Sequence, residues 1–281
     1  FSPTTLPDEG ELKVFNKLIQ NGKNNIDSSH LVVGNDADLV VMAMALHDIY
    51  DIDILIKNRK VYDTVQIKRL LEIFAEKCSI PTNSILYKQS LRQDFAVISI
   101  LMGNDYLPKL SFIKYDTIWD SYINTKKLTH EFLTKDSNLN MKFFKNMLEN
   151  IVLTLPKQFK TINLNAYVQY GEQHIQNYLE GLVWCLQMYE YGKCYMYNYV
   201  CTSPGQPSPV FLLYYLSKND IVIKSPISNV KPLKVYTCAI LLLPRKAHKL
   251  LPEKYHSLIN IKLNKYYEME ECKVCKDYRN K

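Results

Sequence analysis

The feature that most constrains this chain is a pair of apolar runs separated by a short acidic turn. His30–Val33 is apolar and rich in β-branched residues, Gly34 follows, and Asp36 and Asp38 precede a second apolar run, Leu39–Met44. This pattern predicts a buried strand that ends in a turn opening a helix. In α/β sheets, ligands bind at the carboxyl ends of parallel strands. Two carboxylates placed there repel each other unless a cation joins them, and a divalent cation with oxygen ligands fits.

A simpler reading of the same turn is structural. Solvated aspartates often cap the first turn of the helix that follows them. Asp36 and Asp38 alone do not separate that interpretation from metal binding.

Two further acidic segments favour the chemical interpretation. Glu9 and Glu11 repeat the alternating-carboxylate pattern just before a helix-like run. Asp105 lies just past an apolar helix that Gly103 is expected to end. Carboxylates at the ends of several buried elements are what a two-metal nuclease needs to hold two cations about 3.5–4 Å apart.

Three motifs occur in a fixed order along the chain. They are Pro-x-Glu-Gly-Glu-x-Lys at residues 7–13, Gly-x-Asp-Ala-Asp-Leu at residues 34–39 and Gly-Asn-Asp-Tyr-Leu-Pro at residues 103–108. In order and interval they resemble the second half of the nuclease domain of the Xrn family of 5′→3′ exoribonucleases. Residues 178–189 resemble the second conserved region of that family, and Leu242-Leu243-Pro244 with residues 250–255 resemble the segment after it.

The resemblance implies a function and a set of site residues. It implies a metal-dependent 5′→3′ exoribonuclease of RNA decay or processing, which releases mononucleotides from single-stranded RNA with a 5′-monophosphate. Two Mg²⁺ or Mn²⁺ ions would be held in a catalytic site by Glu9, Glu11, Asp36, Asp38 and Asp105. The chain departs from the family pattern at Asp8, Leu12 and Asn35, none of which is a ligand position.

The family also uses aspartates and a basic 5′-phosphate pocket from the amino-terminal part of its nuclease domain. The chain begins at Phe1, a few residues before the first motif, so we expect a fragment. That amino-terminal part would then be needed in cis or in trans.

Two alternatives stay open. Flap endonucleases share the Glu-x-Glu, Asp-x-Asp and Gly-x-Asp-Tyr carboxylates, but they follow the last aspartate with a glycine-rich helix-hairpin, whereas Pro108–Ile113 contains no glycine. A non-catalytic RNA-binding or scaffold relative could also keep the fold, although all five carboxylates are intact.

The expected fold class is α/β. Residues 1–115 alternate strand-like and helix-like segments, which predicts a mostly parallel sheet flanked by helices, as in 5′ nucleases and PIN-like domains. Within them, residues 53–62 read as a strand and a short hairpin, and residues 67–75 and 90–103 as helices. Residues 116–281 are expected to form a mainly helical second region.

Charge is distributed unevenly along the chain. Residues 1–110 hold 12 Lys and Arg against 14 Asp and Glu, and residues 111–281 hold 23 against 14. A basic surface attracts nucleic acid by releasing counterions from its phosphates, although lysines also keep ordinary proteins soluble. We therefore expect the second part to attract RNA.

Cysteine content and hydropathy indicate the compartment. Seven cysteines at irregular spacing favour reduced thiols and an intracellular protein, cytoplasmic or nuclear. No apolar stretch approaches the roughly 18 residues that span a membrane, so no membrane partner is expected.

A tyrosine-rich stretch follows residue 190. Tyr195, Tyr197 and Tyr199 would share one face if the segment were extended. Nucleic-acid bases stack on such side chains, and the alternative is that these tyrosines pack in a half-buried strand.

Overall fold

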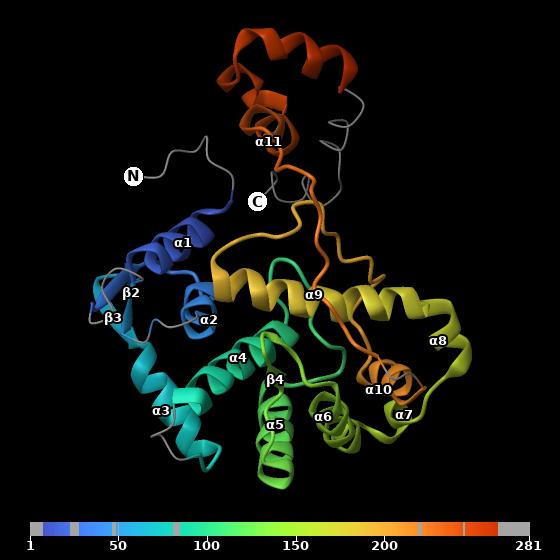
Figure 1. Cartoon of the computed structure of the whole chain (residues 1–281). Coiled ribbons are helices and arrows are strands. Elements are labelled where there is room, and N and C mark those ends of the chain that lie inside the picture. Colours follow the sequence, from blue (N-terminus) through green and yellow to red (C-terminus); the bar gives the residue numbers. More distant parts are fainter. Residues whose placement is uncertain are drawn as a thin grey trace. The chain divides into compact units, whose positions relative to one another are not determined.

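Figure 1 shows the computed structural model of the chain, which describes residues 8–22, 28–46, 49, 51–80, 85–218, 221–243 and 245–263. The chain divides into two compact units. One is residues 9–230, and the other is residues 1–8 together with residues 231–281. All five predicted site carboxylates belong to the unit of residues 9–230, and we describe each unit by itself.

The unit of residues 9–230 begins with alternating helices and strands and continues with helices. Its elements are α1 (Gly10–Gly22), β1 (His30–Val33), α2 (Asp38–Ala45), β2 (Ile52–Asn58), β3 (Val61–Gln66), α3 (Ile67–Lys77), α4 (Ile85–Leu101), α5 (Tyr115–Thr129), β4 (Thr134–Lys135), β5 (Asn138–Leu139), α6 (Met141–Thr154), α7 (Lys157–Lys160), α8 (Leu164–Tyr170), α9 (Glu172–Tyr191) and α10 (Pro209–Lys218). The α/β class predicted from the sequence is confirmed.

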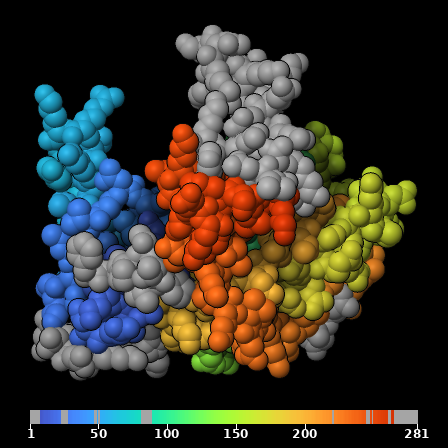
Figure 2. All heavy atoms as spheres, turned by 90° about the horizontal axis from the view of Figure 1, so that it is seen from above, coloured from blue at the N-terminus to red at the C-terminus, as the bar shows by residue number. Residues whose placement is uncertain are grey.

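The sheet of this unit is mixed, not mostly parallel, within the described residues. Its strand order is β1-β2-β3; β1 pairs with β2 in parallel, with His30 opposite Ile52, and β2 pairs with β3 antiparallel. The tight turn at Arg59 and Lys60 makes β2 and β3 a hairpin, and a hairpin forces antiparallel pairing. The hairpin is largely exposed, and its light-blue atoms stand out from the surface in Figure 2.

The strand β1 was expected to be buried, and the structure corrects this. Val32 is 5% exposed, but Leu31 is 61% and Val33 is 70% exposed. Side chains alternate along a strand, so Val32 faces the core and Leu31 and Val33 face away from it. Among the described residues β1 pairs with β2 alone and lies at the edge of the sheet.

The long helix α9 organises the core of the unit. Residues on almost every side of it are buried between Leu179 and Glu190, as expected for a helix that is covered all round. The helices α1, α2, α4 and α10 all contact it, and in Figure 1 it crosses the unit as a long yellow helix. Gly192, at φ 60°, ends α9 with its N–H bonded to the Met188 carbonyl.

One hydrophobic core connects the α/β segments with the later helices. It runs from Leu12 to Ile223 without a break near residue 115. The domain boundary predicted at that point stays a prediction. The described part of residues 116–218 is mainly helical, with one short hairpin formed by β4 and β5.

The second unit is small. It contains α11 (Val235–Leu242), two 3₁₀ turns at Arg245–Leu250 and Glu253–Tyr255, and a π-helical turn at Leu258–Lys262. A separate apolar cluster of Ile240, Leu251 and Ile259 forms its core. No helix in the described part of the chain is long and apolar enough to cross a membrane.

Candidate active site

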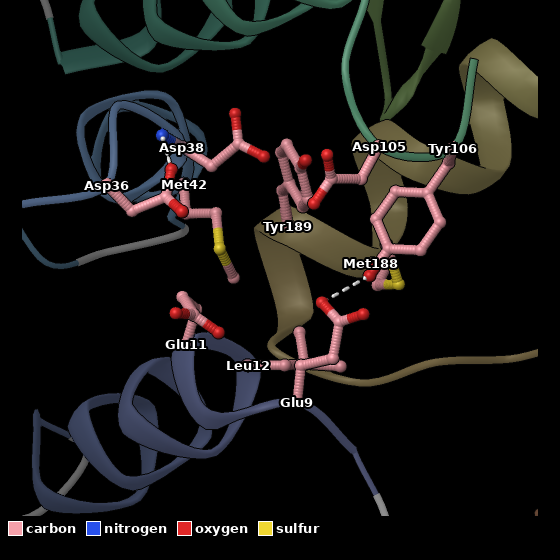
Figure 3. A pocket seen from close by; sticks show the side chains of 10 residues that line it. All are labelled: Glu9, Glu11, Leu12, Asp36, Asp38, Met42, Asp105, Tyr106, Met188 and Tyr189. Carbon is pink, nitrogen blue, oxygen red and sulfur yellow. Dashed lines mark hydrogen bonds between the residues drawn. The ribbon is translucent and has the colours of Figure 1, made fainter. Parts of the chain in front are cut away.

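Three segments that are far apart in the sequence deliver carboxylates to one pocket (Figure 3). Its volume is about 190 Å³. Ten residues line it: Glu9, Glu11, Leu12, Asp36, Asp38, Met42, Asp105, Tyr106, Met188 and Tyr189. The structure therefore brings together all five acidic residues that the sequence singles out.

The turn between β1 and α2 is fixed by hydrogen bonds to β2. The Gly34 N–H donates to the Leu55 carbonyl at 3.1 Å. The Asn35 side chain then accepts from the Lys57 N–H at 2.8 Å and donates to the Lys57 carbonyl at 3.0 Å. Asn35 thus continues the strand pairing with its side-chain amide and leads the chain to Asp36 at the mouth of the pocket.

Asp36 has a local structural role in addition. Its Oδ1 accepts a hydrogen bond from the Asp38 N–H at 2.9 Å, at the start of α2. This bond forms an Asx turn just before α2, whereas the N-cap position of the helix is Ala37 and no side chain caps it. Asp38 itself points into the pocket beside Tyr189 in Figure 3.

Asp105 lies in a short loop that Gly103 and Asn104 shape. Gly103 has φ 94°, and the Lys109 N–H lies 3.1 Å from where a Cβ would be, so only glycine fits the end of α4 without strain. The Asn104 Oδ1 accepts from the Tyr106 N–H at 3.1 Å, and its Nδ2 donates to the Tyr189 hydroxyl at 3.0 Å. The loop that carries Asp105 is thereby tied to α9.

Tyr106 connects this loop to Glu9. Its hydroxyl donates to Glu9 Oε2 at 2.8 Å, and its ring meets Trp184 edge-on at 5.3 Å between centroids. Burial and, after it, the Glu9 carboxylate raise the pKa of Tyr106 well above its ordinary value. The phenol therefore stays protonated and remains a donor to Glu9 across the accessible pH range.

The electrostatics of the pocket are one-sided. No Lys, Arg or His is among its ten lining residues. The pKa of Asp38 is raised above its ordinary 3.8, first by burial and then by Asp36, Asp105, Glu9 and Glu11 in that order. The other four carboxylates therefore act electrostatically on Asp38, and a bound cation would offset this repulsion.

The donor set suits hard divalent cations, which prefer carboxylate oxygens. The carboxylates stand around the wall of the cavity. In the described residues, no group of three or more His, Cys, Asp or Glu side chains converges closely enough to hold an ion. Metal binding by these residues would therefore require their side chains to rotate inward.

Comparison with known proteins relates part of the chain to a nuclease family. Residues 1–57 match the family described as the XRN 5′–3′ exonuclease N-terminus. Glu9, Glu11, Asp36 and Asp38 all fall within the matched residues. This match supports a relationship of the chain to the Xrn family.

A viral protein is also similar to this chain. It comes from Acanthamoeba polyphaga mimivirus, is provisionally named 5′-3′ exonuclease R528, and is 24% identical over 196 residues. The alignment covers 61% of this chain and 31% of the viral protein, so the chain spans about a third of the length of that relative.

The tyrosine-rich stretch is not an extended strand, so the condition under which Tyr195, Tyr197 and Tyr199 would share a face is not met. After α9 ends, residues 193–200 form bends and a turn, in which the Tyr199 N–H donates to the Met196 carbonyl. Tyr199 is stacked on Trp184 at 4.6 Å and donates to the Asn177 carbonyl, whereas Tyr197 is 38% exposed. Lys193 lies over the ring of Tyr195. Nucleic-acid binding by these tyrosines stays a prediction.

Several residues of the site were not singled out from the sequence. Asn104 and Tyr106 lie inside the Gly-Asn-Asp-Tyr motif, so the motif could have indicated them. The sequence prediction uses only its aspartate, Asp105. Met188 and Tyr189 belong to the apolar pattern of α9, which looks the same whether a side chain packs in the core or lines a pocket.

Proposed function

We propose that this chain carries part of the catalytic centre of a metal-dependent 5′→3′ exoribonuclease that hydrolyses single-stranded RNA from a 5′-monophosphate end. One observation carries the proposal: five carboxylates from three separate segments line one cavity that no basic side chain lines. The relationship to the Xrn exonucleases supports the reaction class.

Glu9, Glu11, Asp36, Asp38 and Asp105 would hold two Mg²⁺ or Mn²⁺ ions. Such a pair, when bound, lowers the pKa of a water nucleophile and stabilises the oxygen that leaves the phosphate. Within this chain, Tyr106 orients Glu9 through its 2.8 Å hydrogen bond, and Asn104 fixes the loop of Asp105 against α9. The apolar side chains of Leu12, Met42 and Met188 complete the lining of the pocket.

The 5′-phosphate would be recognised by another segment. The pocket offers no cation for it, so we assign that role to the amino-terminal part of an Xrn-type nuclease domain, acting in cis or in trans. The exposed Leu31 and Val33 on β1, at 61% and 70%, support this division because they are an apolar surface on which such a part could pack.

The experiment compares residues 1–281 with a protein extended upstream through the rest of the nuclease domain. Substrates are single-stranded RNA with a 5′-monophosphate, the same RNA with a 5′-triphosphate, and a DNA flap. We expect the extended protein to degrade the monophosphorylated RNA with Mg²⁺ or Mn²⁺ and to lose this activity in EDTA. Residues 1–281 alone should degrade little or none of it.

Two results would contradict the proposal. Cleavage of the DNA flap at its junction with RNA left intact would place the protein with the flap endonucleases. RNA binding by the extended protein, with no hydrolysis under any metal, would favour a non-catalytic relative.

A further inference from the structure

An exposed aromatic ring stands on the loop that follows the Asp105 motif. Phe112 is 57% exposed, whereas its neighbours Leu110, Ser111 and Ile113 are all buried. An aromatic side chain gains free energy from burial, and this position forgoes much of that gain. The loop is anchored on both sides of Phe112 and still directs its ring toward solvent.

The backbone at Phe112 is strained. Its φ is 61°, in the left-handed region that a bulky side chain rarely adopts. The Ser111 N–H donates to the Pro207 carbonyl at 2.9 Å and fixes the loop next to the strained residue. Strain held in place by surrounding structure is common where a side chain must be presented to a ligand.

A second ring supports Phe112 from one face. Phe159, on α7, stacks on Phe112 with 4.0 Å between centroids and 15° between ring planes. We call these two rings the Phe112–Phe159 platform. Phe159 covers one face of the Phe112 ring, and the two rings come from different segments of the same compact unit.

The charged residues that flank the two rings most closely in the sequence are all lysines. Lys109 and Lys114 flank Phe112 in the loop, and Lys157 and Lys160 flank Phe159 on α7. No Asp or Glu occurs in residues 106–115 or in residues 150–171. Lys109, Lys114 and Lys157 are exposed, and Lys160 also donates to the Leu153 carbonyl.

We infer that the Phe112–Phe159 platform is a binding site for single-stranded RNA, in which a base stacks on Phe112 and the lysines contact the neighbouring phosphates. Stacking on an exposed ring beside cationic side chains is how proteins bind single strands without reading their sequence. The choice of RNA as the polymer rests on the proposed function.

The position of the platform suits a strand that is also engaged at the pocket. Phe112 follows Asp105 by seven residues in the same loop, so the two are at most about 25 Å apart along an extended chain. An acidic protein segment would match the lysines equally, but a flat pair of rings favours a planar base as the occupant.

The test measures binding of a fluorescent oligouridine RNA with a 5′-hydroxyl to residues 1–281 in EDTA, by fluorescence anisotropy. Phe112→Gly removes the ring and relieves the positive φ, so folding should not suffer, and thermal melting checks this. We expect affinity to fall about 5- to 150-fold. Phe112→Trp should restore it, and Val168→Ala, which trims an exposed apolar side chain on α8, should leave it unchanged.

A second measurement uses the lysines. Lys114→Gln and Lys157→Gln should each lower the slope of log affinity against log salt by about one. Unchanged RNA affinity in Phe112→Gly would overturn the inference. So would a loss of affinity for a polyglutamate peptide in place of a loss for RNA.

The outcomes also separate this inference from the proposed function. If Phe112→Gly keeps its RNA affinity while Asp105→Asn abolishes hydrolysis by the extended protein, the inference that the platform binds RNA is wrong and the proposed function stands. If Phe112→Gly loses affinity while Asp105→Asn hydrolyses RNA normally, the platform stands and the proposed function fails.

Discussion

Among single residues, Asp38 shows the conflict within the pocket most clearly. It is half-buried, and four other carboxylates raise its pKa in addition to burial. An ionised side chain in this position destabilises the folded chain when no cation is present. The same arrangement favours cation binding, so one residue can be unfavourable for folding and favourable for function.

Replacing Asp38 by Asn should therefore stabilise the metal-free chain near neutral pH. Because the folded-state pKa lies above the ordinary 3.8, the folded state binds a proton more tightly than the unfolded state, and stability falls as pH rises through the folded pKa. The gain in melting temperature of Asp38→Asn should be full at pH 7 and should shrink toward pH 4. Melting in EDTA at several pH values measures it, and a lower melting temperature at pH 7 would contradict the account.

Tyr106 offers a second test at this scale. Tyr106→Phe removes the hydrogen bond to Glu9 but keeps the ring against Trp184. Loss of such an outer partner typically costs 10- to 100-fold in metal affinity or activity, and we expect a reduction of about this size in Mn²⁺ affinity of the extended protein by calorimetry. Tyr62→Phe, which removes an exposed hydroxyl on β3, is the matched control. Equal Mn²⁺ affinity in the two variants would argue against a positioning role for Tyr106.

Among the elements, α4 holds the later part of the unit to the earlier part through one buried carboxylate. Asp94 is fully buried and accepts hydrogen bonds at both oxygens. The donors are the Tyr122 hydroxyl at 2.6 Å, the Leu133 N–H at 2.9 Å, and the N–H and hydroxyl of Thr134 at 2.8 and 2.5 Å. Burial raises the pKa of Asp94 to about 6, and these hydrogen bonds oppose the rise. The helices α4 and α5 and the β4–β5 hairpin thus meet at one side chain.

Asp94→Asn should destabilise the chain severely although it preserves shape. The amide nitrogen would face two donors, so one end of the side chain would leave buried polar groups unpaired. We expect a loss of about 2–5 kcal/mol in the free energy of unfolding, measured by urea denaturation. Asp116→Asn, an exposed aspartate on α5, should change stability little. A loss in Asp94→Asn no larger than in Asp116→Asn would mean that the network does not hold these elements together.

The elements were more predictable from the sequence than their contacts were. Glycines and apolar periodicity located α1, β1, the hairpin and the end of α4, because these signals are local. The bonds of Asn35 to Lys57, of Tyr106 to Glu9 and of Asp94 to Thr134 join residues 22, 97 and 40 positions apart. No local pattern records such partners. The five carboxylates were found from the motifs, whereas their spread around the wall of the pocket was not.

At the scale of the whole molecule, the exposed side of β1 is the surface on which we propose that the amino-terminal part of the nuclease domain packs. Leu31→Ser with Val33→Ser should leave the melting temperature of residues 1–281 nearly unchanged, because both side chains are already exposed. In the extended protein the same pair should lower activity and melting temperature. Val168→Ser, an exposed position on α8, is the control. Full activity of the extended double variant would show that nothing essential packs on β1.

The central claim is that the carboxylate pocket is a metal-dependent site of RNA hydrolysis. The most direct test is single-turnover degradation of 5′-monophosphorylated RNA by the extended protein carrying Asp36→Asn or Asp105→Asn, with exposed Asp63→Asn on β3 as the control. An amide keeps the shape of a carboxylate but loses the charge that holds a dication. We predict a loss of several orders of magnitude in rate, an apo melting temperature that is unchanged or slightly raised, a smaller Mn²⁺-induced shift, and a normal control. Rates in both variants close to that of the unsubstituted protein would contradict the account.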